Sequence, residues 1–246
     1  MIRYAKKFRF FSIYENWFGY EKGPGGPLGL YAVFHQKTPG RITGIQEDSH
    51  TYEIDLTRDW DTILSAINKG FRQDVRKAAE AGIEIHPTKD LNRFVDFFNE
   101  FARLKCTFGT SLHRMEEKGS KLECFVAVKD GIWLAAHSYL VDADLNMVRH
   151  YQTATVRFDE QFDSIVVGRA NKFALVSALQ QYKDRGFTTF DLGGCVPDTK
   201  EKDIAGINVY KSRFGGELVV CKDTYSYLYW IMKKISKLLG NKSGTV

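Results

Sequence analysis

The sequence predicts an α+β fold in which a mixed, mostly antiparallel central sheet is flanked by helices. Residues 122–155 alternate as three strands joined by short turns, which is the pattern of an antiparallel meander. Residues 165–221 then change to a helical period and return to short strands. Hydrophobic residues make up 43% of the chain and charged residues 26%, as in folded globular proteins. Together these observations favour an α+β sandwich.

The chain of 246 residues is long enough for one large domain, because a domain usually holds about 100–200 residues. We expect residues 1–50, an aromatic and Gly/Pro-rich segment, to belong to the same domain as a core over residues 51–222. Residues 223–246 are expected to form a basic C-terminal helix. The Gly/Pro cluster over residues 23–27 predicts a loop, which is either a plain surface loop or a lid over a ligand.

The cellular compartment is suggested by what the sequence contains and lacks. Its four cysteines include no C-x-x-C pair, which favours reduced thiols in the cytoplasm. The N-terminal region has no long apolar stretch of the secretory kind. We therefore expect a cytoplasmic protein. The C-terminal helix, apolar and then rich in lysine, leaves contact with the inner membrane surface open as an alternative to simple docking on the core.

Elements of the first half are predicted from apolar spacing and capping signals. Asp59 can cap a helix that runs through Ile63 and Ile67, and Gly82 can end the helix that follows. The other expected elements are a strand over residues 52–56, a helix over 71–81, a strand over 83–86 that stops at Pro87, and a helix over 91–105.

The second half begins with strands over residues 122–128, 132–141 and 146–155. Asp130 and Gly131 favour a tight hairpin turn, since both tolerate positive φ angles. The remaining elements expected are a helix over 165–183, a strand over 187–192, a helix over 207–214, a strand over 217–221 and a helix over 225–239.

The start of the long helix is a candidate phosphate site. The first turn of a helix exposes unpaired N–H groups, and the helix dipole favours an anion there. Gly168 and Ala170 are small enough to let a pyrophosphate approach the backbone, and Arg169 can add a charged contact. The alternative is a glycine with a purely structural role. The predicted cofactor-binding residues are Val167, Gly168, Arg169, Ala170 and Asn171.

Three stretches of the chain resemble a known family. They are residues 54–56 with 71–83, residues 190–194 (FDLGG), and residues 206–218, which contain YKSRFGGEL. In this order they resemble the GNAT acyltransferase superfamily and, within it, the Fem-type peptidoglycan-bridge aminoacyltransferases and their shorter relatives. The resemblance covers about residues 52–220. Fem-type enzymes carry two acyltransferase-like domains and some have a helical arm for transfer RNA, whereas this chain has room for one domain and a reduced N-terminal part.

The resemblance implies an acyl-CoA donor, with coenzyme A bound at the helix start and its pantetheine arm between two splayed strands. Those strands would be residues 146–155 and 187–192. N-acylation needs a neutral amine beside the acyl carbonyl, a donor for the oxyanion and a proton for the leaving group. A backbone N–H in the splayed strands would serve the oxyanion.

Candidate catalytic residues lie on these strands. Asp191 can accept the amine proton or orient the acceptor; the alternative is a carboxylate that caps the Gly193–Gly194 turn. His137 can act as a base near neutral pH, and so can His150, although a lone histidine on a strand is more often a packing residue. Tyr151 can protonate a thiolate or serve as a core aromatic, and alternation places it on the face opposite His150.

Candidate substrate contacts are basic or aromatic. Arg72 and Arg76 share a helix face and can hold acceptor phosphates, unless they form only a solvated basic face. The resemblance places Lys211 and Arg213 on the acceptor side. The remaining candidates, Tyr14 and Trp17, stand beside the Gly/Pro loop and can stack on a sugar or base ring.

The function predicted from these residues is N-acyl transfer from acyl-CoA to the amine of a nucleotide-linked amino sugar in surface-polysaccharide synthesis. One alternative is Fem-type aminoacyl transfer from charged transfer RNA to a peptidoglycan precursor. Another is a degenerate acyltransferase fold that only binds a partner, since the strand–helix junction departs from the usual phosphate loop. The net charge of +5 is mild and spread out, so we expect no DNA partner. No metal is expected.

Overall fold

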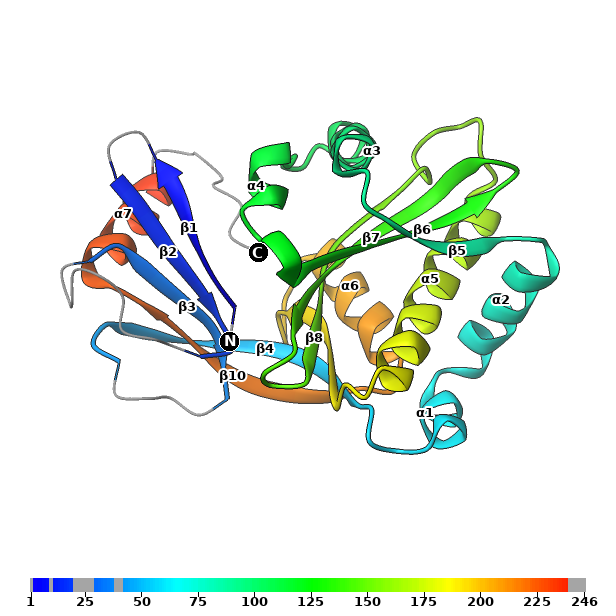
Figure 1. The fold of residues 1–246 in the computed structure, drawn as a ribbon, viewed down its shortest axis with the longest axis horizontal. Coiled ribbons are helices and arrows are strands. Elements are labelled where there is room, and N and C mark those ends of the chain that lie inside the picture. Colours follow the sequence, from blue (N-terminus) through cyan, green and yellow to red (C-terminus); the bar gives the residue numbers. More distant parts are fainter. Residues whose placement is uncertain (1, 9–10, 20–28, 38–41, 239–246) are drawn as a thin grey trace.

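The computed structural model describes residues 2–8, 11–19, 29–37 and 42–238, and its strands form a single mixed sheet (Figure 1). The strand order among these residues is β1-β2-β3-β10-β4-β9-β8-β7-β6-β5. Only the β2–β3 and β8–β9 pairs of the described strands are parallel. The predicted mixed, mostly antiparallel sheet is confirmed. The strands are β1 (Ile2–Phe8), β2 (Phe11–Trp17), β3 (Tyr31–Gln36), β4 (Ile45–Asp55), β5 (Glu84–Thr88), β6 (Leu122–Lys129), β7 (Ile132–Asp142), β8 (Met147–Thr155), β9 (Thr189–Cys195) and β10 (Glu217–Tyr225).

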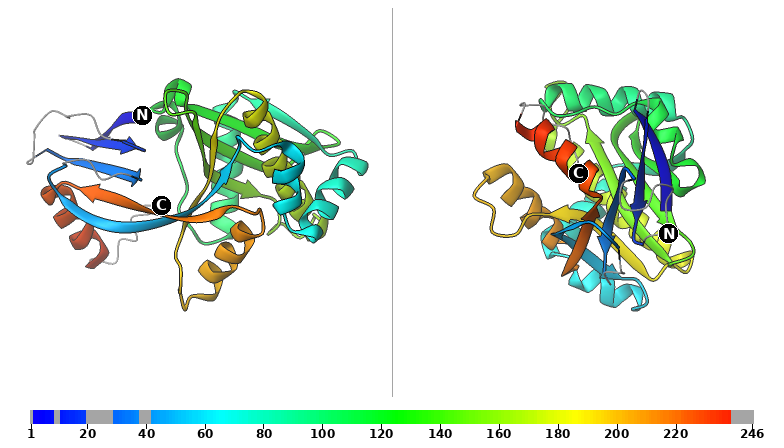
Figure 2. Two further views of the ribbon diagram at one scale, coloured as in Figure 1. Left: turned by 90° about the horizontal axis from the view of Figure 1, so that it is seen from below. Right: turned by 90° about the vertical axis from the view of Figure 1, so that its left-hand side faces the viewer.

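The molecule has a small and a large lobe that share this sheet (Figures 1 and 2). The small lobe consists of β1, β2, β3 and helix α7 (Tyr227–Leu238), packed around a core that includes Trp17, Phe34 and Tyr229. Strand β10 pairs with β4 over its whole length and with β3 at its C-terminal end. The long strands β4 and β10 therefore run from one lobe into the other.

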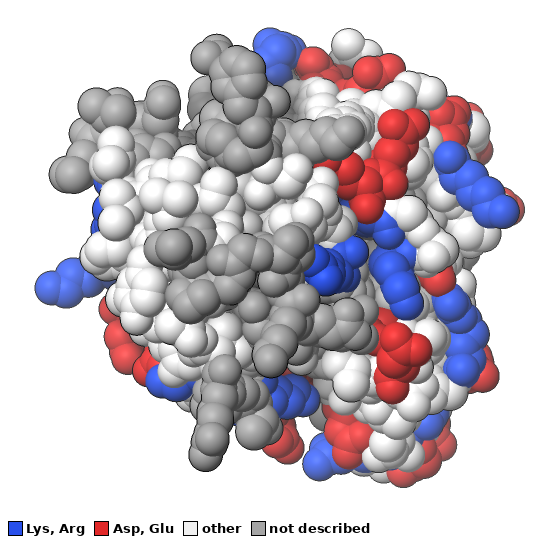
Figure 3. Space-filling model, turned by 60° about the vertical axis from the view of Figure 1, so that its left-hand side comes forward, with Lys and Arg blue, Asp and Glu red and all other residues white. Residues whose placement is uncertain are grey.

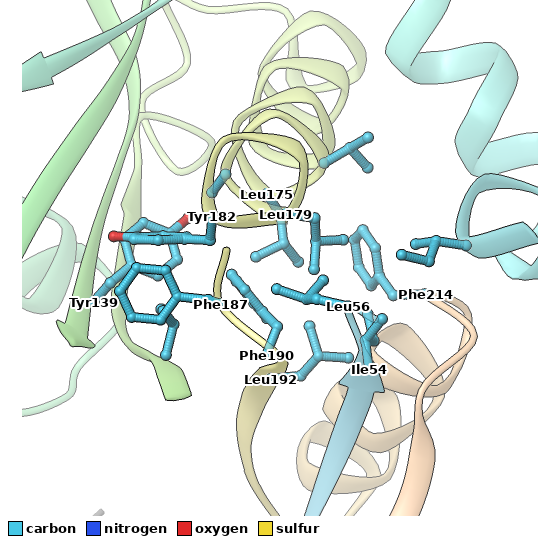
Figure 4. Close-up of a cluster of buried hydrophobic side chains, with 14 of the residues drawn as sticks. Ile54, Leu56, Tyr139, Leu175, Leu179, Tyr182, Phe187, Phe190, Leu192 and Phe214 are labelled. Carbon is cyan, nitrogen blue, oxygen red and sulfur yellow. The ribbon is translucent and has the colours of Figure 1, made fainter. Parts of the chain in front are cut away.

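Helices cover both faces of the sheet in the large lobe. One face is covered by α1 (Trp60–Ala66), α2 (Lys69–Glu80) and α5 (Ser164–Asp184), and the other by α3 (Leu91–Leu104) and α4 (Leu112–Glu116). Leu175, Leu179 and Tyr182 follow one stripe of α5 because they are spaced by four and three residues. They pack on Phe190 and Leu192 of β9, and all five side chains belong to the main hydrophobic core (Figure 4).

Several capping and turn predictions are confirmed. The Asp59 carboxylate accepts a hydrogen bond from the Thr62 amide at 2.8 Å and caps α1. Gly82 follows α2 with a φ of +73°. Asp130 and Gly131 have φ angles of 51° and 78°, as the type I′ turn of a β-hairpin requires.

Other boundaries differ from the predictions. Strands β1–β3 were not expected, β4 begins seven residues before Tyr52, and α6 (Lys202–Ser212) begins before Ile207. Strand β10 continues to Tyr225, where a helix was expected to begin. Strand β5 passes through Pro87; it is the outermost strand of the sheet, where a missing N–H breaks no ladder bond. The predicted loop over residues 23–27 lies outside the described residues.

No described helix is both long and apolar enough to cross a membrane.

Gly215, in the turn between α6 and β10, allows a close backbone approach. Its φ is +78°, and a Cβ placed there would lie 2.7 Å from the backbone of Ala66. We expect Gly215→Ala to lower the free energy of unfolding, measured in urea, by at least about 3 kcal/mol, from backbone strain plus the clash. Gly82→Ala is the matched control, because its φ is +73° but nothing lies within 4 Å of the added atom. Strain alone should cost it about 1 kcal/mol; equal losses in both variants would contradict this explanation.

Candidate active site

A gap opens in the sheet between β8 and β9. The two strands pair in parallel from Met147 and Thr189 only as far as Arg149 and Asp191. Beyond that point β8 continues along β7, whereas the end of β9 pairs with β4. The predicted splayed strands are therefore confirmed, and their separation begins at a charged pair.

Arg149 and Asp191 form a buried ion pair at the start of this gap. Their exposed fractions are 3% and 0%, and Arg149 Nη1 donates to Asp191 Oδ2. The other carboxylate oxygen accepts hydrogen bonds from the Thr51 hydroxyl and, at 2.7 Å, from the Gly193 amide. Burial alone would raise the pKa of Asp191, but Arg149 and these hydrogen bonds outweigh it and lower the pKa.

This environment does not fit the predicted role of Asp191 as a general base. Both carboxylate oxygens are engaged, and a lowered pKa makes the group a poor proton acceptor. The bond from Gly193 is the turn-capping interaction of the alternative prediction. Asp191 thus holds the turn of β9 and positions Arg149.

The small lobe supplies a wall against Arg149. The Arg149 guanidinium lies 5.0 Å from the centre of the Trp17 ring, and that ring also stacks with His35 at 5.7 Å. His35 has a φ of 53° and is fixed by its amide, which donates to Asp223 at 2.9 Å. Burial and the charge of Arg149 lower the pKa of His35 to about 4. His35 is therefore neutral at neutral pH and adds no second cation.

Trp17 and Tyr14, predicted to stack on a sugar or base ring, do not lie on one surface of the protein. Trp17 is only 4% exposed and belongs to the core of the small lobe. The two residues are three apart on β2, so their side chains lie on opposite faces. Tyr14 instead contacts Arg3, whose guanidinium carbon is 4.8 Å from the ring centre.

Lys211 reaches the same gap from α6. Its Nζ donates to the Gly194 carbonyl oxygen at 2.6 Å and would lie 3.2 Å from a Cβ on Gly193. Burial, with the charge of Arg149, lowers the pKa of Lys211 to about 8. Lys211 was predicted as a substrate contact, and the structure brings it together with Arg149 and Asp191. Two cations, Arg149 and Lys211, thus lie near the Asp191 carboxylate at this gap.

The other predicted basic contacts lie elsewhere. The Arg213 guanidinium turns toward α2, 5.7 Å from the centre of the Phe71 ring. Arg76 is exposed and forms an ion pair with Glu80 at 3.4 Å, as expected for a solvated helix face. Arg72 lies on the same helix and is half-buried. Binding of acceptor phosphates by Arg72 and Arg76, and a contact of Arg213 with the acceptor, stay predictions.

A second network of hydrogen bonds connects the sheet to helices α5 and α6. His137 contacts the Tyr139 hydroxyl through Nδ1 at 2.9 Å and Asn171 Oδ1 through Nε2 at 2.7 Å, and Asn171 Nδ2 donates to Tyr210 at 2.9 Å. This assignment of the amide places the imidazole proton on Nε2. Burial lowers the pKa of His137 to about 4. With both nitrogens engaged, His137 does not fit its predicted role as a base; it links β7 to α5 and α6.

Tyr151 and His150 point to opposite sides of β8, as predicted. Tyr151 has no partner in the register with β7, and its ring lies against Trp17 at 6.1 Å. His150 stacks on Tyr139 at 5.3 Å on the other face. Burial and the charge of Glu15 raise the pKa of Tyr151 to about 12, so the phenol keeps its proton. A role for Tyr151 in protonating a leaving group stays a prediction.

The residues predicted to bind a phosphate lie past the start of α5, and their role stays a prediction. The helix begins at Ser164, and its cap is the Asp163 carboxylate, which accepts from the Ile165 amide at 2.8 Å. The Val167 amide is bonded to the Asp163 carbonyl oxygen at 3.0 Å. The residues from Val167 to Asn171 thus lie beyond the free amides of the first turn.

The side chains of this segment also have other roles. Val167 and Ala170 are buried in the core. Arg169 forms an ion pair with Asp74 at 3.4 Å, and Asn171 is hydrogen-bonded to His137. Gly168 faces open space, since an added Cβ would meet only Lys172 Nζ at 3.9 Å. The loop before the helix carries three acidic residues, which repel a pyrophosphate: Asp159, Glu160 and Asp163.

Three residues of the gap were missed by the sequence analysis: Arg149, Thr51 and His35. Arg149 left a signal, because a charged residue directly follows Met147 and Val148 in a strand predicted to be buried. Thr51 and His35 left none. They reach the site only through the pairing of β4 with β9 and the packing of the small lobe.

A pocket of about 220 Å³, lined by both charged and apolar side chains, lies where β4 ends and β10 begins. Glu53 lines it and is the register partner of Asp191, so the two side chains share a face of the sheet. Burial raises the pKa of Glu53, although Lys37 Nζ lies 2.5 Å from its carboxylate. Among the described residues, no group of three or more His, Cys, Asp and Glu side chains could hold a metal ion.

No family model and no curated protein matches the sequence. Similar solved structures include FemX, with a TM-score of 0.65, 11% identity, and coverage of 94% of this chain and 85% of that chain. The C-terminal domain of a putative lysylphosphatidylglycerol synthetase from Agrobacterium fabrum has a TM-score of 0.61 at 13% identity, covering 87% and 75% of the two chains. L-PGS from Bacillus licheniformis has a TM-score of 0.57 at 11% identity, covering 98% and 86%. At these identities the likeness concerns the fold alone: the chain shares the fold of FemX and of these two structures, in line with the expected GNAT-like sheet.

Proposed function

We propose that this protein is an acyltransferase that holds the carbonyl group of its donor where β8 and β9 separate. The observation that carries the proposal is that two cations meet at this point, the buried Arg149 and the half-buried Lys211, and that Asp191 forms its described ion pair with Arg149. A buried excess of positive charge stabilises an oxyanion that develops during the reaction. The donor carbonyl supplies such an oxyanion when an amine attacks it.

The chemistry balances without a redox partner. The acceptor nitrogen attacks the carbonyl carbon, a C–N bond forms, and the carbonyl oxygen becomes the oxyanion that Lys211 and Arg149 stabilise. Collapse of this intermediate breaks the bond to the leaving sulfur or oxygen. The proton lost by the amine passes to the leaving group, so an amide and a thiol or alcohol are produced.

The donor that we propose is an aminoacyl ester on transfer RNA, and the structure gives less support to acyl-CoA. Acidic residues precede α5, and Asp163 occupies the end of the helix where coenzyme A would place its pyrophosphate. One similar structure bears the name lysylphosphatidylglycerol synthetase, which indicates a lysyl group attached to an acceptor in that protein. For this chain we propose an amine acceptor: either a peptidoglycan precursor or, as the sequence first suggested, a nucleotide-linked amino sugar.

Paired transfer assays test the proposal. The protein is incubated with transfer RNA that carries a radiolabelled amino acid and with a soluble peptidoglycan precursor or a nucleotide-linked amino sugar. A parallel series uses acyl-CoA and follows release of free thiol. We expect label to move from transfer RNA to an acceptor and thiol release to stay at background.

Three other results are informative. Thiol release with an acyl-CoA would overturn the aminoacyl donor and restore the acyl-CoA reaction. Transfer that survives loss of both Arg149 and Lys211 would show that the gap is not the reaction site. Folded protein that transfers from neither donor would favour the binding-module alternative.

A further inference from the structure

Helix α7 closes the small lobe and is firmly attached through its inner face. Tyr229 is 9% exposed and belongs to the core of that lobe. The indole N–H of Trp230 donates to Glu47 at 3.0 Å, and Lys233 Nζ lies 2.8 Å from the same carboxylate. The helix is thus fixed to β4 by burial and by polar contacts.

The outer face of α7 is apolar and exposed. Tyr227, Leu228, Ile231 and Ile235 are 47%, 45%, 48% and 50% exposed. A helix turns by about 100° per residue, so these four positions fall on one stripe about 100° wide. The helix is already anchored through its inner face, yet these large apolar side chains remain half-exposed in one row. Such a row indicates a surface that binds an apolar partner.

The charge around the stripe indicates what that surface contacts. Residues 227–238 include three lysines and no acidic residue. Of these lysines, Lys234 lies beside the stripe, with its ammonium 5.0 Å from the centre of the Trp230 ring. Uncharged side chains cover much of the described surface of this face, with both basic and acidic side chains around its edge (Figure 3). An apolar stripe bordered by the exposed Lys234 fits a lipid surface that carries negative headgroups.

The position of α7 is compatible with a flat partner. The helix lies at the end of the small lobe, and α1 and α2 lie at the opposite end of the molecule (Figures 1 and 2). A lipid surface can therefore reach α7 without contact with the far side of the large lobe.

We propose that α7 docks the protein on an anionic lipid surface, with Tyr227, Leu228, Ile231 and Ile235 placed at the boundary between headgroups and acyl chains. Lys234 then lies at the level of the lipid phosphates. This docking does not depend on the transfer reaction and can be tested without any substrate.

Co-sedimentation of the full chain with vesicles tests the docking. The vesicles contain phosphatidylcholine alone or phosphatidylcholine with phosphatidylglycerol. We expect binding to the anionic vesicles that weakens at high salt, because the lysine contribution is screened. Ile231→Glu should weaken it by roughly tenfold or more, because a carboxylate replaces buried apolar area. Ile132→Glu is the matched control: Ile132 is also 48% exposed but lies on β7, and this variant should bind like the unchanged protein.

Circular dichroism and the melting temperature establish that both variants remain folded. Failure of the unchanged protein to bind anionic vesicles would overturn the proposal, and so would equal losses in the two variants. If sedimentation without lipid instead shows a dimer that Ile231→Glu dissociates, the stripe contacts a second copy of the chain, and the lipid proposal is wrong.

Discussion

Replacing Arg149 by methionine should lower the free energy of unfolding by about 3–5 kcal/mol, because it leaves a buried carboxylate without its cation. Asp191 is fully buried, and its two hydrogen bonds from Thr51 and Gly193 do not replace the lost charge. Urea denaturation followed by circular dichroism measures the loss. Transfer activity should also disappear, since Arg149 borders the gap in the sheet.

A double variant separates charge from packing. Arg149→Met with Asp191→Asn removes both charges but keeps an amide that can accept the bonds from Thr51 and Gly193. We expect it to recover much of the stability and none of the activity. If the double variant is as unstable as the single one, the stranded charge is not the cause of the loss.

The same pair has a defined pH dependence. The pKa of Asp191 is lowered in the folded state, so its stabilising contribution is present above the unfolded value of about 3.9. That contribution is lost as the pH falls toward the lowered folded pKa. Acid unfolding of the unchanged protein should therefore include a component below about pH 4 that the double variant lacks.

Replacing Lys211 by methionine should lower the rate of transfer by roughly 10²–10³-fold, the usual effect of removing an oxyanion donor. The same change should not destabilise the protein and is expected to raise its melting temperature. Burial has lowered the pKa of Lys211 to about 8, so keeping this ammonium in the fold costs stability at neutral pH. A loss of both activity and stability would indicate that Lys211 has a structural role.

The pH profile gives a second readout for Lys211. A lysine with a folded pKa of about 8 carries its charge below that pH, so kcat should fall as the pH rises through 8. For stability the sign is opposite: between about 8 and the ordinary value near 10.4 the unfolded chain binds more protons, and stability rises with pH. Lys211→Arg keeps the charge and should move the fall in kcat to higher pH while retaining part of the activity.

Much of the large lobe was predictable because its signals are local. The caps at Asp59 and Gly82 and the Asp130–Gly131 turn depend on a few neighbouring residues. The strands β1–β3 gave weaker signals: they pair with one another and with β10, nearly two hundred residues away in the sequence. Pairing at such a distance is not visible in local periodicity.

Only part of the candidate site was predicted, because several of its residues take their roles from partners that are distant in the sequence. The splayed strands and Lys211 followed from a family resemblance, and both occur at the gap. The start of the long helix was expected at residue 165 and lies at Ser164, but the residues chosen for phosphate binding, around Gly168 and Ala170, come after its first turn. The roles of Asp191 and His137 depend on burial and on partners distant in the sequence, Arg149 of β8 for Asp191 and Asn171 of α5 for His137, which turn two candidate bases into structural links.

The strands that join the lobes also limit how the site can change shape. Strands β4 and β10 are hydrogen-bonded to each other along their whole overlap, and they carry Thr51, Glu53 and Asp223 between the two halves. A hinge would have to break this ladder. The width of the cleft is therefore set when the chain folds, and adjustment to a bound molecule is left to sheet twist and to the segments between strands. The two lobes are therefore expected to move little relative to each other when a substrate binds.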